Sequence, residues 1–115
     1  MMCERGYKPP HREVLTEHFK NERLDRYVFI VMNVGLGDPI KTIKVIDEEG
    51  LTSYHTITTT GIIIIRNPQD ELITLYVAKR VQAEKFFEGK MPMALEGKIN
   101  YNIGKNYHNL SNGKI

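Results

Sequence analysis

Four consecutive isoleucines, Ile62–Ile65, constrain the fold of this chain more than any other feature of its sequence. The run has no polar alternation, so other parts of the protein must cover both faces of the element that it forms. Gly61 precedes the run and Pro68 follows it, and both residue types are typical of turns and strand ends. We therefore predict that these isoleucines form a central strand of a sheet.

Three further strands are predicted around this run, at residues 40–47, 51–60 and 72–77. Residues 51–60 are rich in threonine, which is β-branched and tolerates a half-exposed position in a sheet. Short turns at Asp47–Gly50 and Asn67–Asp70 connect the strands. Short connections favour antiparallel pairing.

Helices are predicted before the strands. Leu15, Phe19 and Arg23 are spaced by four residues, as on one face of a helix. Segment Arg26–Met32 is apolar after its first residue, and its periodicity fits either a buried strand or a buried helix. We favour a helix, because Gly35 and the residues after it are typical of a helix C-terminus, although the β-branched residues favour a strand.

Another helix is predicted at Arg80–Gly89, which contains good helix formers. The sequence therefore predicts an α+β domain over residues 1–90. It has one or more N-terminal helices, a four-stranded, mainly antiparallel sheet with helices on one face, and a C-terminal helix. Residues 91–115 are rich in asparagine and poor in aliphatic residues, so we expect a flexible, polar, basic tail, with a short strand around residues 99–103.

Charge is distributed unevenly along the 115 residues. The net charge is +2, and the segment from Lys98 onward has three lysines and no acidic residue. The rest of the chain is close to neutral, whereas a protein that coats nucleic acid is usually more basic. A specific site with a few cations is compatible with this composition.

The sequence also bears on location and cofactors. No apolar run approaches the roughly 18 residues of a membrane span, the N-terminal segment is polar, and Cys3 is the one cysteine. We therefore expect a cytoplasmic protein that does not contact membranes. The histidines lack the spacing of a metal site, and we expect no metal and no cofactor.

Hydroxyl and cationic side chains could form a phosphate-binding face on the sheet. Alternation along the strands predicts hydroxyls in step at Tyr54, Thr56, Thr58, Thr60, Thr74 and Tyr76. Cations are expected at strand ends, at Arg66, Lys79 and Arg80. Hydroxyls with cations suit phosphate oxygens; the simpler interpretation is a solvated sheet surface with charged strand ends.

A motif spanning two strands resembles a known family. It consists of Thr58, Gly61, Ile62 and Ile64, followed by Ile73, Thr74 and Tyr76. Together with the N-terminal helix, it resembles small RelE-like and BrnT-like proteins of the barnase, colicin-D and RelE ribonuclease group, which occur in toxin–antitoxin pairs and on prophages. In that group a helix histidine is often followed by arginine at four and eight residues. Here Arg26 stands eight residues after His18, but Glu22 stands at four and Arg23 at five.

The resemblance implies metal-independent cleavage of RNA. His18 would act as general base or acid on the ribose 2′-hydroxyl. Arg23, Arg26 and Lys44 would offset charge on the phosphate, and Thr74 or Tyr76 would position it. The residues expected to bind nucleic acid are Lys44, Arg66, Tyr76, Lys79 and Arg80. The implied partners are RNA and an antitoxin-like protein.

Two other hypotheses remain open. The first is a non-catalytic phage or mobile-element protein that binds a host protein or nucleic acid, with the threonine-rich strand as a docking edge. The second is a homodimer formed through the apolar segment Tyr27–Met32, which needs burial in the core or against a partner.

Overall fold

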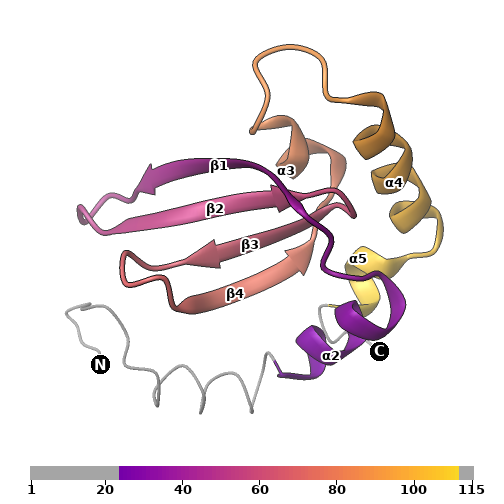
Figure 1. Ribbon diagram of the computed structural model, residues 1–115, viewed down its shortest axis with the longest axis horizontal. Helices are drawn as coiled ribbons and strands as arrows, with labels where there is room; N and C mark the ends of the chain where they lie inside the picture. The colour runs from indigo at the N-terminus through magenta and orange to yellow at the C-terminus, as the bar shows by residue number, and fades with distance from the viewer. Residues whose placement is uncertain (1–23, 112–115) are drawn as a thin grey trace.

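The computed structural model describes residues 24–111, which form one four-stranded sheet with helices on both of its faces (Figure 1). The elements are α2 (Leu24–Asn33), β1 (Pro39–Ile46), β2 (Thr52–Thr58), β3 (Ile62–Arg66), β4 (Leu72–Val77), α3 (Arg80–Glu84), α4 (Met93–Gly104) and α5 (Tyr107–Leu110). Each strand pairs antiparallel with the next along the chain, in the order β1-β2-β3-β4. The predicted α+β class and the four antiparallel strands are confirmed.

The isoleucines of β3 contribute to two separate hydrophobic clusters. Ile63 and Ile65 contact the first cluster, on the face covered by α3 and α4, whereas Ile62 and Ile64 contact the second, on the face covered by α2 and α5. The buried members of the first cluster are Ile57, Ile63, Ala78, Ala83, Phe86, Met91, Leu95 and Ile99. Those of the second are Ile30, Ile62, Leu75 and Val77. The prediction of a strand covered on both faces is confirmed, and the prediction of helices on one face is wrong.

Segment Arg26–Met32 is helical, as we preferred from the sequence. Ile30 is fully buried in the second cluster, so packing outweighs the β-branched content of the segment. Gly35 ends the helix, with φ of +86° and an N–H that donates to the Ile30 carbonyl at 2.7 Å. A glycine in this conformation is the helix stop that the sequence indicated.

The segment after residue 91 differs from the tail that we expected. Met93–Gly104 forms α4, including the residues around 99–103 where we predicted a strand. Leu95, Ile99 and Asn102 follow a spacing of four and three, so they share one helix face, and all three are buried. Composition concealed this helix because one member of its buried face is an asparagine.

The helix predicted at Arg80–Gly89 is shorter than expected, because α3 ends at Glu84. Phe86 lies beyond the helix but is still buried in the first cluster.

The turn between β3 and β4 is organised by one buried side chain, that of Asn67. Its Oδ1 accepts hydrogen bonds from the backbone N–H of Gln69 at 3.0 Å and of Glu71 at 2.9 Å. Its Nδ2 donates to the carboxylate of Glu71 at 3.0 Å. These bonds hold the short connection that the sequence predicted at Asn67–Asp70.

Candidate functional site

Arg26 of α2 brings together groups that are distant in the sequence. Its Nη1 donates to the Thr74 hydroxyl at 3.2 Å and to the Leu75 carbonyl at 3.3 Å. Its Nε donates to the carbonyl of Ser111, just after α5, at 3.0 Å. We call Arg26, Thr74, Leu75 and Ser111 the β4-edge site.

The position of β4 explains this arrangement. β4 is an edge strand, so alternate backbone groups have no neighbouring strand to bond with. Helix α2 packs along β4 and supplies a guanidinium, whose donors lie in a fixed planar arrangement. Arg26 therefore covers part of this edge, and its half-buried charge lies beside a half-buried hydroxyl.

The other hydroxyls do not gather on one face. Thr56 of β2 lies opposite Ile64, which contacts the second cluster. Thr74 lies opposite Ile65, and Tyr76 opposite Ile63, both of which contact the first cluster. The β2 threonines and the β4 hydroxyls therefore lie on opposite faces of the sheet, which contradicts the single face that we expected.

A register shift explains another difference in β4. Ile65 pairs with Thr74 while the next residue, Arg66, pairs with Leu72, so Ile73 is an extra residue in this strand. Leu72 consequently packs against the second cluster rather than sharing a face with Thr74. Sequence alternation cannot detect such a bulge.

Tyr76 is half-buried against the first cluster. Burial raises the pKa of its phenol above the usual value of 10.0, so the hydroxyl stays protonated at neutral pH.

The predicted cations are spread over the molecule. Lys44 is exposed on β1, opposite Tyr54. Arg66 ends β3, with its Nε 3.5 Å from the Asp70 carboxylate. Lys79 and Arg80 follow the opposite end of β4 from the β3–β4 turn. The structure therefore does not bring these four residues together.

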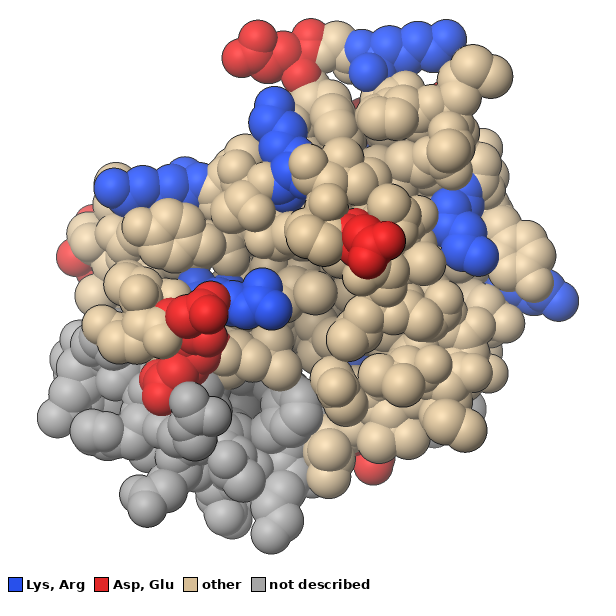
Figure 2. All heavy atoms as spheres, viewed as in Figure 1, with Lys and Arg blue, Asp and Glu red and all other residues tan. Residues whose placement is uncertain are grey.

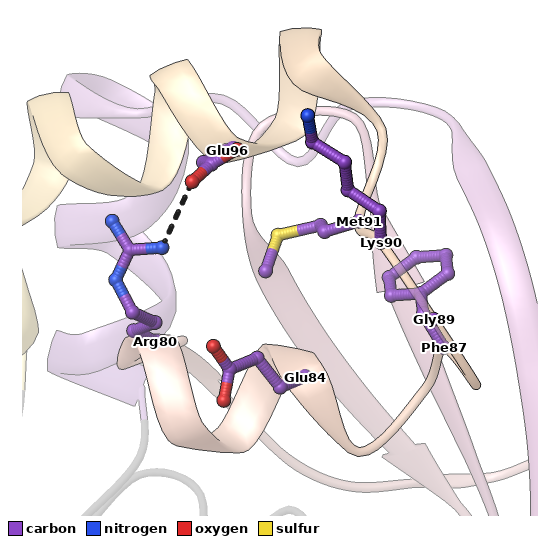
Figure 3. Close-up of a pocket in the computed structure, with 7 residues that line it drawn as sticks. All are labelled: Arg80, Glu84, Phe87, Gly89, Lys90, Met91 and Glu96. Atoms are coloured by element: carbon purple, nitrogen blue, oxygen red, sulfur yellow. Dashed lines mark hydrogen bonds and ion pairs between the residues drawn. The ribbon is translucent and has the colours of Figure 1, made fainter.

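Arg80 lines a pocket of about 290 Å³ between α3 and α4 (Figure 3). Its Nη1 lies 3.2 Å from the Glu96 carboxylate across the pocket, and its Nη2 donates to Asn100. The remaining lining residues are Glu84, Phe87, Gly89, Lys90 and Met91. Glu96 offsets the charge of Arg80, so this pocket has no excess of positive charge to attract phosphate.

His55 is a titratable residue to which the sequence assigned no role. Its Nε2 lies 3.0 Å from the Ser53 hydroxyl, and it shares the first-cluster face with Thr74 through Ile65. Burial, and secondly the charge of Lys85, lower its pKa below the usual value of 6.5. The imidazole is therefore neutral at pH 7. In the sequence, the spacing of two residues between Ser53 and His55 on one strand was the only feature that could have indicated this contact.

His18 and Arg23 lie outside the described residues. Within residues 24–111, no three or more His, Cys, Asp or Glu side chains cluster in a way that could hold a metal ion. In the same range, no helix combines the length and apolar character needed to cross a membrane.

Arg26 and Thr74 are thus the two expected catalytic residues whose contact the described part of the chain records. Comparison with family models, curated proteins and solved structures gave no match for this chain. The resemblance to RelE-like and BrnT-like ribonucleases, with its antitoxin-like partner, therefore stays a prediction.

Proposed function

We propose that this chain is a small metal-independent ribonuclease with its active site at the β4-edge site. The hydrogen bond between Arg26 and Thr74 supports this proposal, because the mechanism requires a cation and a hydroxyl at one place. Both side chains are half-buried, a position in which a charge acts more strongly on a phosphate than it does in open water.

The proposed reaction is an internal transfer of phosphate. A base removes the proton of the ribose 2′-hydroxyl, and the 2′-oxygen bonds to the adjacent phosphorus. The bond from phosphorus to the 5′-oxygen breaks, and that oxygen takes up a proton. The products are a 2′,3′-cyclic phosphate and a 5′-hydroxyl.

Arg26 would stabilise the negative charge that develops on the phosphate oxygens, and Thr74 would donate a hydrogen bond to one of them. His18 is the base that the family resemblance implies. Arg26 also holds the backbone at Leu75 and Ser111, so part of its role is structural.

The test is cleavage of labelled RNA by the purified chain in EDTA, with detection of the cyclic phosphate. Thr74→Ala and His18→Ala should each lower the rate by about 100-fold or more, whereas Thr74→Ser should retain most of it. Thr42→Ala is the matched control, because the hydroxyl of this strand threonine also has a side-chain hydrogen-bond partner, the Thr56 hydroxyl at 2.7 Å, but Thr42 lies on β1, away from Arg26.

Two results would refute the proposal. One is the absence of cleavage by a folded wild-type chain, and the other is a rate that Thr74→Ala and Thr42→Ala leave equally unchanged. Thermal unfolding of each variant shows whether a lost activity comes from a lost fold.

A second candidate, a homodimer formed through the apolar segment of α2, is favoured by the outward face of this helix. Leu24, Val28 and Val31 are spaced by four and three residues, so they form one stripe, and Met32 borders it. Their exposed fractions are 37%, 48%, 43% and 77%. An apolar stripe of this kind on a short helix indicates a docking surface.

We propose a second copy of the chain as the occupant of this stripe. None of its four side chains carries a charge, so two copies crossing through a two-fold axis would bury apolar groups without leaving a charge unpaired. Val28→Glu should convert a dimer to a monomer in analytical ultracentrifugation.

Val81→Glu is the control for this test, because Val81 is 62% exposed on α3. It should leave the dimer intact. A wild-type chain that stays monomeric at high concentration would exclude this candidate.

A further inference from the structure

The C-terminal part of α4 and the residue that follows the helix carry positive charge, whereas the acidic residue of α4, Glu96, lies in its first turn. From Gly97 to Ser111 the chain has two lysines, Lys98 and Lys105, and no acidic residue. Figure 2 shows blue side chains at the right-hand edge of the molecule, over α4. Neither lysine belongs to the β4-edge site.

Both lysines are placed around one tyrosine. Tyr101 follows Lys98 by three residues and precedes Lys105 by four, so the three side chains share a helix face. The ammonium groups lie 5.1 Å and 5.7 Å from the centroid of the Tyr101 ring. We call Lys98, Tyr101 and Lys105 the α4 patch.

Tyr101 is unusually open for a large aromatic residue, with an exposed fraction of 51%. It is also supported from within the fold. The ring of Tyr107 meets it edge-on at 6.4 Å, and Tyr107 meets Phe29 in the same way at 5.6 Å. Tyr107 and Phe29 both pack against the second cluster. The Tyr101 ring is therefore held in place by contacts that lead to the core.

We propose that the α4 patch binds single-stranded nucleic acid, with a base stacked on Tyr101 and the flanking phosphates bound by Lys98 and Lys105. Cation–π contacts at exposed positions are weak, so a base can displace the ammonium groups from the ring. The displaced ammonium groups then lie beside the phosphates on either side of that base. An aromatic ring flanked by cations is the arrangement that binds single strands with little sequence preference.

Charge complementarity selects this partner over others. A polyanion without bases would use the lysines but gain nothing from an exposed ring. An acidic membrane surface would favour additional apolar side chains around the patch, whereas Asn100 and Gly104 border it. Arg80 bonds to Asn100 and adds a cation nearby, although Glu96 offsets its charge.

This inference rests on the proposed function in naming RNA as the natural ligand, but its test is independent of cleavage. The probes are a fluorescent 2′-O-methyl oligouridylate and an oligothymidylate, neither of which has the free 2′-hydroxyl that the cleavage reaction uses. If the chain binds both probes but does not cleave RNA, the proposed ribonuclease activity is refuted and the proposed binding site is not.

Affinity is measured by fluorescence anisotropy between about 50 and 200 mM salt. Tyr101→Ala should weaken binding about tenfold or more, whereas Tyr101→Phe, which keeps an aromatic ring, should bind as the wild type does. Log affinity falls as log salt concentration rises. The double variant Lys98→Gln/Lys105→Gln should make this slope shallower by about 1.4, because two phosphate contacts are lost. The double variant Lys41→Gln/Lys90→Gln makes the same change of net charge at exposed lysines elsewhere and should leave affinity within twofold.

Heparin and anionic phospholipid vesicles serve as competitors. If heparin binds as tightly as the oligonucleotides do, and Tyr101→Ala does not change its affinity, the patch is a simple polyanion site and the proposal is overturned. Binding of vesicles without binding of either oligonucleotide would overturn it in favour of a membrane surface. Equal losses in the two double lysine variants would show that net charge, not this patch, determines affinity.

Discussion

Two glycines between α2 and β1 have almost the same backbone conformation but different surroundings. Gly35 has φ of +86° and Gly37 has φ of +77°. A Cβ atom at Gly35 would meet nothing within 4 Å. A Cβ atom at Gly37 would lie 2.7 Å from the Thr59 hydroxyl, 2.8 Å from the Thr60 hydroxyl and 2.9 Å from the Thr60 backbone nitrogen. The pair therefore separates the effect of conformation from that of packing.

Alanine at either position loses about 1 kcal/mol, because an L-residue disfavours the left-handed region. At Gly37 the threonine hydroxyls must also move. The Thr59 hydroxyl accepts from Asp38 N–H at 3.0 Å, and the Thr60 hydroxyl donates to the Gly35 carbonyl at 2.6 Å. Breaking these two bonds costs about 1 kcal/mol each, so Gly37→Ala should cost about 3 kcal/mol and Gly35→Ala about 1 kcal/mol.

Urea denaturation measures both values. In thermal unfolding, the midpoint temperature should fall by about 12 °C for Gly37→Ala and about 4 °C for Gly35→Ala. Equal losses for the two variants would refute the reasoning, because the two positions differ in the contacts of the added methyl group and not in φ.

Two further predictions concern the sheet. Asn67→Ala removes the single oxygen that accepts hydrogen bonds from the backbone N–H groups of Gln69 and Glu71 and should lower the free energy of unfolding by about 2–3 kcal/mol in urea; a loss below about 0.5 kcal/mol would contradict a structural role of this side chain. Because the pKa of His55 is lower in the folded chain than the unfolded value of 6.5, the unfolded chain binds its proton first as the pH falls. Stability should therefore be unaffected by this group above about pH 7 and decrease below about pH 6.5. His55→Gln should remove that part of the decrease, and unfolding curves of identical pH dependence in both proteins would disprove it.

Much of the sheet could be predicted because its signals are local. The Ile62–Ile65 run and the turn residues after it define the central strand without reference to distant residues. Segment Arg26–Met32 was ambiguous by composition, and the glycine stop at Gly35 was the feature that correctly indicated a helix. These features could be predicted because the conformational preferences of neighbouring residues favour the same local structure.

The remaining features depend on contacts that no local pattern encodes. The bulge at Ile73 changes which side chains share a face, and alternation cannot indicate it. Arg26 and Thr74 were both candidates, the former through the family resemblance, but the third partner, the Ser111 carbonyl, lies 85 residues from Arg26. Helix α4 was not predicted because Asn102, a polar residue, occupies one of the buried positions on its inner face.

The contrast between local strand pairing and the distant Arg26 contacts has a consequence for refolding. Every strand pairs with its neighbour in the chain, so the sheet can form from short-range contacts early in folding. Arg26 reaches Leu75 and Ser111 only after long stretches of chain have come together, which places closure of the β4 edge late. Until then the outer edge of β4 is uncovered, and its free backbone groups can pair with another chain. The yield of refolded monomer should therefore fall as the protein concentration during refolding rises.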